Sequence, residues 1–133
     1  MRVLKRMFLI VETAAVDTEA GTDSPVTLVC TVDNVDVINY TVIDSPQNDF
    51  DTGQANCYEI PLPRKLVKEK LSDGSFRVEI RGDDWWLPKR VFVIATDSMG
   101  RSHVLVNIPD WTGKGLSTDP LEGKTSYPLP LSD

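Results

Sequence analysis

Several features that mark membrane proteins and common enzymes are missing from this chain of 133 residues. There is no apolar run of about 18 residues, so no segment is expected to span a membrane. One histidine and two cysteines are too few to form a zinc site of the usual ligand types. The glycine-rich phosphate loop, the dinucleotide-binding fingerprint and the serine nucleophile elbow are also absent. These absences favour a binding protein over an enzyme.

Basic residues are absent from Met7 to Pro63, a stretch that contains ten Asp and Glu. Such an acidic stretch repels the phosphate backbone of nucleic acids, and the net charge of the whole chain is −6. The bases that follow, from Arg64 to Lys70 and at Lys89 and Arg90, are too few to offset this repulsion. They are interpreted as solvated surface residues. We therefore expect no nucleic-acid partner.

The N-terminus and the cysteines bear on the compartment of the protein. The apolar run from Met7 to Val11 ends at Glu12, whereas the apolar region of a signal peptide needs about seven to fifteen residues. We therefore expect a cytoplasmic or cell-associated protein. Cys30 and Cys57 lie in apolar strand-like segments and are expected to be buried free thiols.

Apolar residues recur at alternate positions or in short continuous runs, and no helical repeat extends over three turns. This pattern predicts an all-β protein, a two-sheet antiparallel β-sandwich of about seven to eight strands with an irregular C-terminal segment. The region from Pro63 to Asp73 is the only one expected to form a short helix. The expected strands span residues 3–13, 26–32, 35–44, 55–61, 75–82, 91–96 and 103–108.

One domain is expected, because no linker divides the chain. Residues 1–110 are predicted to form the sandwich. Residues 111–133 are rich in proline and glycine and are predicted to pack on the same domain. Trp111, Tyr127 and Leu129 are the side chains expected to hold this C-terminal segment in place.

Aspartates are concentrated in three of the predicted loops. Calcium takes six to eight oxygen ligands in flexible geometry, which loops gathered at one end of a sandwich supply readily. The alternative is that these aspartates only serve the loops, where Asp is a common residue. The candidate ligands are Asp17 and Asp23, Asp49 and Asp51, and Asp83 and Asp84.

Trp85 and Trp86 are adjacent at the end of a predicted strand, so their rings are expected to point in opposite directions. One ring can then enter the core while the other contacts a sugar, a lipid surface or a protein partner. The alternative is that both rings pack inside. Both residues are therefore candidates for ligand or partner contact.

Four segments together resemble the PLAT (lipoxygenase-homology) domain family, over about residues 4–97. The matches at Gly21 to Asp23 and at Phe50 to Gly53 are the most specific. The four segments are Asp17–Val26, Thr27–Val32, Asp49–Ile60 and Phe76–Leu87.

The resemblance implies an eight-stranded antiparallel sandwich that works as a non-catalytic module. In that family the module directs lipases, lipoxygenases and membrane proteins to lipid surfaces or protein partners, often with calcium. The resemblance implies that Gly21, Asp23 and the loop of Asp83 are calcium positions. The expected function is therefore a calcium-modulated interaction with a lipid surface or a protein.

Three alternatives remain at this stage. The first is a carbohydrate-binding module in which an exposed tryptophan stacks on a sugar ring. The second is a structural or assembly component that docks through the segment from Pro109 to Asp133. The third is an enzyme that uses His103 with a nearby carboxylate.

Overall fold

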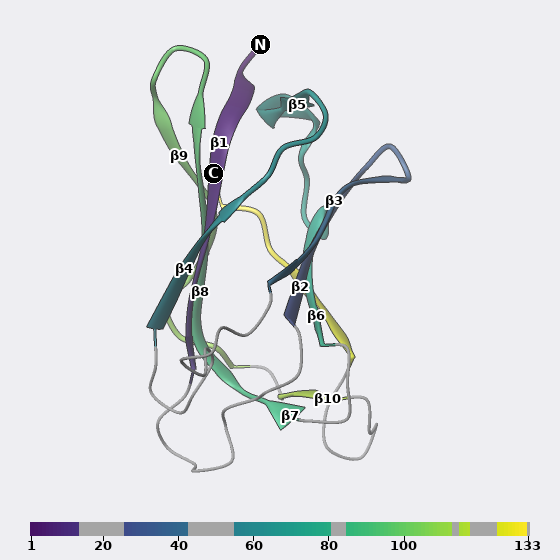
Figure 1. Ribbon diagram of the computed structural model, residues 1–133, viewed down its shortest axis with the longest axis vertical. Coiled ribbons are helices and arrows are strands. Elements are labelled where there is room, and N and C mark those ends of the chain that lie inside the picture. Colours follow the sequence, from purple (N-terminus) through teal and green to yellow (C-terminus); the bar gives the residue numbers. More distant parts are fainter. Residues whose placement is uncertain (14–25, 43–54, 81–84, 113–114, 118–124, 133) are drawn as a thin grey trace.

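The computed structural model describes residues 1–13, 26–42, 55–80, 85–112, 115–117 and 125–132. Its strands form two sheets that face each other, with a smaller two-stranded sheet towards one end (Figure 1). Every pairing between described strands is antiparallel. The predicted all-β sandwich is therefore confirmed.

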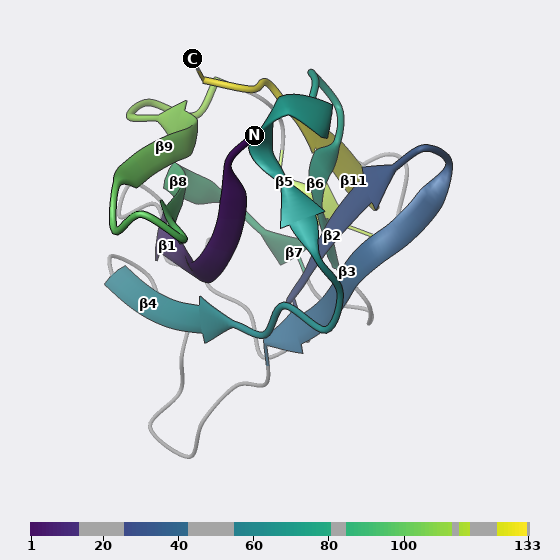
Figure 2. The ribbon, with the colours of Figure 1, turned by 90° about the horizontal axis from the view of Figure 1, so that it is seen from above.

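The first sheet has the order β4-β1-β8-β9, and β5 pairs with the start of β1. Figure 2 shows β5 beside the N-terminal part of β1. The strands of this sheet are β1 (Val3–Thr13), β4 (Ala55–Ile60), β5 (Leu66–Val67), β8 (Pro88–Asp97) and β9 (Ser102–Ile108).

The second sheet has the order β11-β6-β2-β3, and the small sheet pairs β10 with β7. A short 3-10 helix, η1 (Lys68–Lys70), follows β5. The remaining strands are β2 (Val26–Val32), β3 (Val35–Val42), β6 (Phe76–Ile80), β7 (Trp85–Trp86), β10 (Leu116–Ser117) and β11 (Ser126–Leu129).

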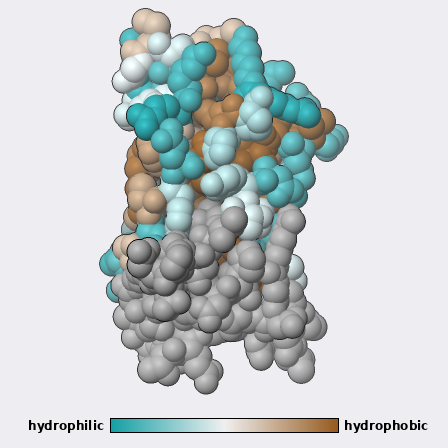
Figure 3. All heavy atoms as spheres, viewed as in Figure 1, coloured by the Kyte–Doolittle hydropathy of each residue, from teal (hydrophilic) through white to brown (hydrophobic). Residues whose placement is uncertain are grey.

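Alternation along the strands places the core between the two sheets. In β6, Phe76, Val78 and Ile80 are buried while the residues between them are partly exposed, as the sequence predicts. In β1 the continuous apolar run also alternates, with Met7 and Leu9 fully buried. Apolar side chains reach the surface between the two sheets in the upper half of Figure 3.

Among the described residues, no helix has the length and the apolar character needed to cross a bilayer.

The helix predicted between Pro63 and Asp73 is wrong. Leu66 and Val67 form β5 instead, because they pair with Leu4 and Val3 at the edge of the first sheet. Only the single 3-10 turn of η1 follows. Pairing with β1 and burial of Leu66 outweigh a helical propensity that spans only two turns.

The prediction that both cysteines are buried is correct for Cys30 and wrong for Cys57. Both thiols are free. Burial, and next the charge of Asp36, raise the pKa of the Cys30 thiol to about 12, which keeps it protonated and unreactive. Cys57 lies on β4, an edge strand of the first sheet, and its side chain is on the exposed face.

The C-terminal segment is more regular than predicted. β11 pairs with β6 and so becomes an edge strand of the second sheet. Leu129 is buried in the core, and the rings of Trp111 and Tyr127 meet edge to face with their centroids 5.2 Å apart. The three side chains predicted to hold this segment therefore all pack on or in the core.

Candidate functional site

Most of the predicted site falls in parts of the chain that the structure leaves undescribed. This applies to every predicted cation ligand, and to the side chain of Trp85. The ligands concerned are Asp17, Gly21, Asp23, Asp49, Asp51, Asp83 and Asp84.

The strands that flank these residues have ends that lie together. Glu12 near the end of β1 pairs with Ala55 at the start of β4. Val26 at the start of β2 pairs both with Val42 at the end of β3 and with Ile80 at the end of β6. These strand ends all lie at the lower end of the sandwich in Figure 1, which we call the Thr13 end.

A buried hydrogen bond joins two of the strands at the Thr13 end. The indole Nε1 of Trp86 donates to Oγ1 of Thr13 over 2.9 Å, and both residues are completely buried. A buried hydroxyl or indole N–H without a partner is costly, so this bond constrains both strands. Thr13 immediately precedes residues 14–25, and only Trp85 separates Trp86 from residues 81–84. This hydrogen bond therefore connects the strand ends that adjoin two of the predicted loops.

Burial separates the roles of the tryptophan pair. The expectation that one ring enters the core is confirmed by Trp86, whose side chain has no exposed surface. For the same reason Trp86 is not placed to contact a ligand at the surface. The predicted contact role therefore rests with Trp85.

Sequence reasoning missed Thr13. It follows Val11 at the alternate position of β1 that faces the core, so the period of two would have marked it as a buried polar residue. A buried threonine needs a hydrogen-bond partner, and an indole is a suitable donor. The sequence alone does not identify Trp86 as that donor.

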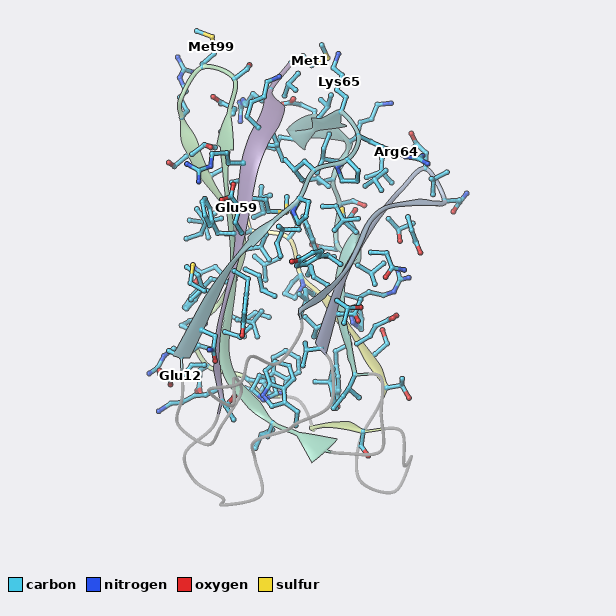
Figure 4. All side chains as sticks on the ribbon, in the orientation of Figure 1. Met1, Glu12, Glu59, Arg64, Lys65 and Met99 are labelled. Atoms are coloured by element: carbon cyan, nitrogen blue, oxygen red, sulfur yellow. The ribbon has the colours of Figure 1, made fainter. Side chains whose placement is uncertain are left out.

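Glu12, at the Thr13 end, forms ion pairs with two basic residues. Glu12 accepts a short hydrogen bond from Arg90 and lies 3.9 Å from Nζ of Lys89. Figure 4 shows Glu12 towards this end of the molecule. Within the part of the chain that the structure describes, no group of three His, Cys, Asp or Glu is placed to hold a metal ion.

His103 has a structural partner. Its Nε2 lies 2.8 Å from Oδ2 of Asp97, whose other oxygen accepts backbone N–H groups of Met99 and Arg101 at 2.8 and 3.0 Å. The Asp97 side chain is only 2% exposed, and its contacts span the turn between β8 and β9. The carboxylate therefore holds this hairpin together.

Asp97→Asn is expected to reduce the loss of stability in acid. The hydrogen bond from His103, and next the backbone N–H of Arg101, lower the pKa of Asp97 from 3.8 to about 2. This pKa is lower in the folded state than in the unfolded state. The ionised Asp97 carboxylate therefore stabilises the fold above about pH 4, and this stabilisation is lost as the pH falls to about 2. Urea unfolding of both proteins across this range measures the difference.

His103→Gln serves as a second variant, because it removes the largest cause of the pKa shift and leaves the carboxylate in place. We expect His103→Gln to reduce the loss of unfolding free energy in acid, as Asp97→Asn does, but by a smaller amount. Identical pH profiles for Asp97→Asn and the unmodified protein would contradict this account of the hairpin.

No family model matches the sequence, and no curated protein matches it. Solved structures do match. Alpha toxin from Clostridium absonum superposes on 95% of this chain with a TM-score of 0.70 and 23% identity. Coral 8R-lipoxygenase superposes on 97% of the chain with a TM-score of 0.64 and 16% identity. The chain has a C2-like, or PLAT, fold.

A second lipoxygenase structure, of Delta413-417:GS LOX, gives a TM-score of 0.62 over 97% of the chain at 15% identity. The PLAT-fold chain spans 31% of the toxin chain and 17% of each lipoxygenase chain. In coral 8R-lipoxygenase, calcium activation is attributed to a C2-like domain. The fold implied by the sequence resemblance is thereby confirmed.

Proposed function

We propose that this chain is a non-catalytic module that binds an anionic lipid surface in a calcium-dependent manner through the Thr13 end. One observation carries the proposal. The strand ends that flank the three aspartate-bearing segments lie together at one end of the sandwich, and the buried bond from Trp86 to Thr13 joins two of them. The fold adds support, since a C2-like domain is linked to calcium activation in coral 8R-lipoxygenase.

The proposed mechanism is electrostatic. Carboxylates gathered at one end repel an anionic headgroup, and a bound calcium ion cancels that repulsion while leaving open positions for headgroup oxygens. An exposed aromatic ring suits the interface between headgroups and acyl chains, and this is the role proposed for Trp85. The proposed ligands are the aspartates at 17, 23, 49, 51, 83 and 84, with the backbone at Gly21.

The variant Asp23→Asn/Asp83→Asn is expected to lose calcium-dependent membrane binding. The unmodified protein should co-sediment with vesicles of phosphatidylcholine and phosphatidylserine in millimolar calcium, and remain in the supernatant in EDTA or in magnesium alone. A melting curve checks calcium binding itself. Calcium at about 100 times its Kd adds about 2.7 kcal/mol to stability, which raises Tm by several degrees.

Asp33→Asn is the matched control, because Asp33 is an exposed turn residue of the hairpin between β2 and β3, away from the Thr13 end. It should keep both the rise in Tm and the vesicle binding. Vesicle binding that is equal in calcium and in EDTA would contradict the proposal, and so would a full calcium response in the double variant. A calcium-dependent Tm without vesicle binding would redirect the search to a protein partner.

A further inference from the structure

A pocket of about 550 Å³ lies at the start of β1, at the end of the sandwich opposite Thr13. Its walls come from the first residues of β1, the chain between β4 and β5, and the turn after β8. We call it the Arg64 pocket. In Figure 4, Arg64 and Lys65 lie at the same upper end of the molecule as Met1 and Met99.

The backbone explains why a hollow forms here. The edge of β1 pairs with β4 as far as Met7 and with β5 at Leu4, so no described strand pairs with Lys5 and Arg6 on that edge. The intervening chain, residues 61–65, contains Pro61 and Pro63. Proline has no amide hydrogen for a strand ladder, so this segment leaves the edge of the sheet.

Lys5 reaches this pocket from an irregular point of β1. In the pairing with β8 the register shifts between Leu4 and Arg6, which makes Lys5 the extra residue of a β-bulge. Bulges re-aim side chains and are common beside binding sites. The turn after β8 is tied to the same place, because the N–H of Ser98 donates to the carbonyl of Val3 over 2.8 Å.

The described charged residues that line the pocket are all positive. Lys5, Arg64 and Lys65 contribute to its wall, and none of the described carboxylates does so. Among the described residues, no acidic group lies within ion-pair distance of these three cations. No carboxylate of the described chain therefore neutralises these three charges.

The nearby carboxylates already have other partners. The carboxylate of Glu59 accepts hydrogen bonds from Nε and Nη2 of Arg6, each at 3.0 Å. Glu69 lies 3.4 Å from Arg2. The hydrogen bonds and charges of these arginines hold the pKa values of both carboxyl groups below their usual range, so they stay ionised and paired.

A second pocket of about 420 Å³ lies on the other side of Arg64 and Lys65. Its wall includes Asp33, which lies 3.6 Å from Lys70. The carboxylate makes this second pocket a mixed-charge surface. The Arg64 pocket is therefore the better site for an anion.

We propose that the Arg64 pocket binds a phosphate monoester. A dianionic phosphate matches three unbalanced cations better than a single carboxylate does, and a guanidinium such as Arg64 can hold two phosphate oxygens at once. Val3, Leu62 and Pro63 supply apolar wall for the organic part of the ester. The volume is in the ordinary range for small-ligand sites.

The test uses the full chain in EDTA, which separates it from the calcium-dependent function of the Thr13 end. Two probes distinguish the source of the phosphate group. Phenyl phosphate, titrated by amide NMR, represents a soluble ester. Vesicles of phosphatidylcholine with phosphatidic acid, tested by co-sedimentation, represent a lipid headgroup. Saturable shifts at Lys5, Arg64, Lys65 and Ser98 are expected with phenyl phosphate.

The variant Arg64→Gln/Lys65→Gln is expected to weaken phosphate binding by about tenfold or more, because two charge-assisted contacts are lost. Lys89→Gln/Arg101→Gln makes the same change in net charge at exposed residues outside the pocket and should bind normally. Binding of the vesicles as well as phenyl phosphate would identify a headgroup that reaches the pocket from a membrane. Failure of both probes, or equal loss in the two double variants, would overturn the proposal.

Discussion

Trp86→Ala is expected to lower the free energy of unfolding by about 3–5 kcal/mol, the range measured for large aromatic residues truncated in cores. Trp86 is the largest fully buried side chain of the described residues, so its removal leaves a cavity beneath the Thr13 end. The truncation also leaves the Thr13 hydroxyl buried without its donor. Urea unfolding followed by circular dichroism measures the change.

A second variant separates the hydrogen bond from the packing. Trp86→Phe keeps most of the apolar bulk and removes the N–H, and the unpaired Thr13 hydroxyl should cost about 1–3 kcal/mol. Adding Thr13→Val to that variant should recover part of the loss, because both polar groups are then gone. A double-mutant cycle with no coupling between the two positions would contradict the assigned bond.

Leu129→Ala is expected to cost about 2–5 kcal/mol, as for other buried leucines. Leu129 is 1% exposed, pairs with Phe76 of β6, and accepts a hydrogen bond from the Gly74 N–H through its carbonyl oxygen. It belongs to β11, so the variant measures how far the C-terminal segment contributes to the sandwich. Thermal and urea unfolding give the value.

Leu131→Ala is the matched control for Leu129→Ala. The same chemical change is made two residues further on, where the side chain is only partly buried. Its cost should be clearly smaller. If both variants lower the free energy of unfolding by the same small amount, β11 contributes little to the stability of the fold.

The two proposals assign opposite electrostatic roles to the two ends of the sandwich. The segment without bases, from Met7 to Pro63, supplies Asp23 and Asp49 to the proposed calcium end. The bases that follow begin with Arg64 and Lys65, which line the pocket at the other end. The two proposals thus place an acidic cation site and a basic anion site at opposite ends of the sandwich.

Local sequence determined the longer strands and their inward faces. The period of two in Phe76 to Ile80 specifies one buried face, because successive side chains of a strand point to opposite sides. The turn at Asp33 and Asn34 also suits its local sequence. Both residues adopt positive φ, 52° and 64°, and Asp and Asn tolerate this conformation in tight hairpins.

Tertiary structure decided the features that depend on a distant partner. Leu66 forms a strand because β1 offers an edge, and Cys57 is exposed because its side chain lies on the outward face of β4. The sequence marks Arg64 as basic but does not place it beside Lys5. The periodicity and turn residues of a segment act over a few positions, whereas strand pairing, buried hydrogen bonds and pockets join residues about 60 to 70 positions apart.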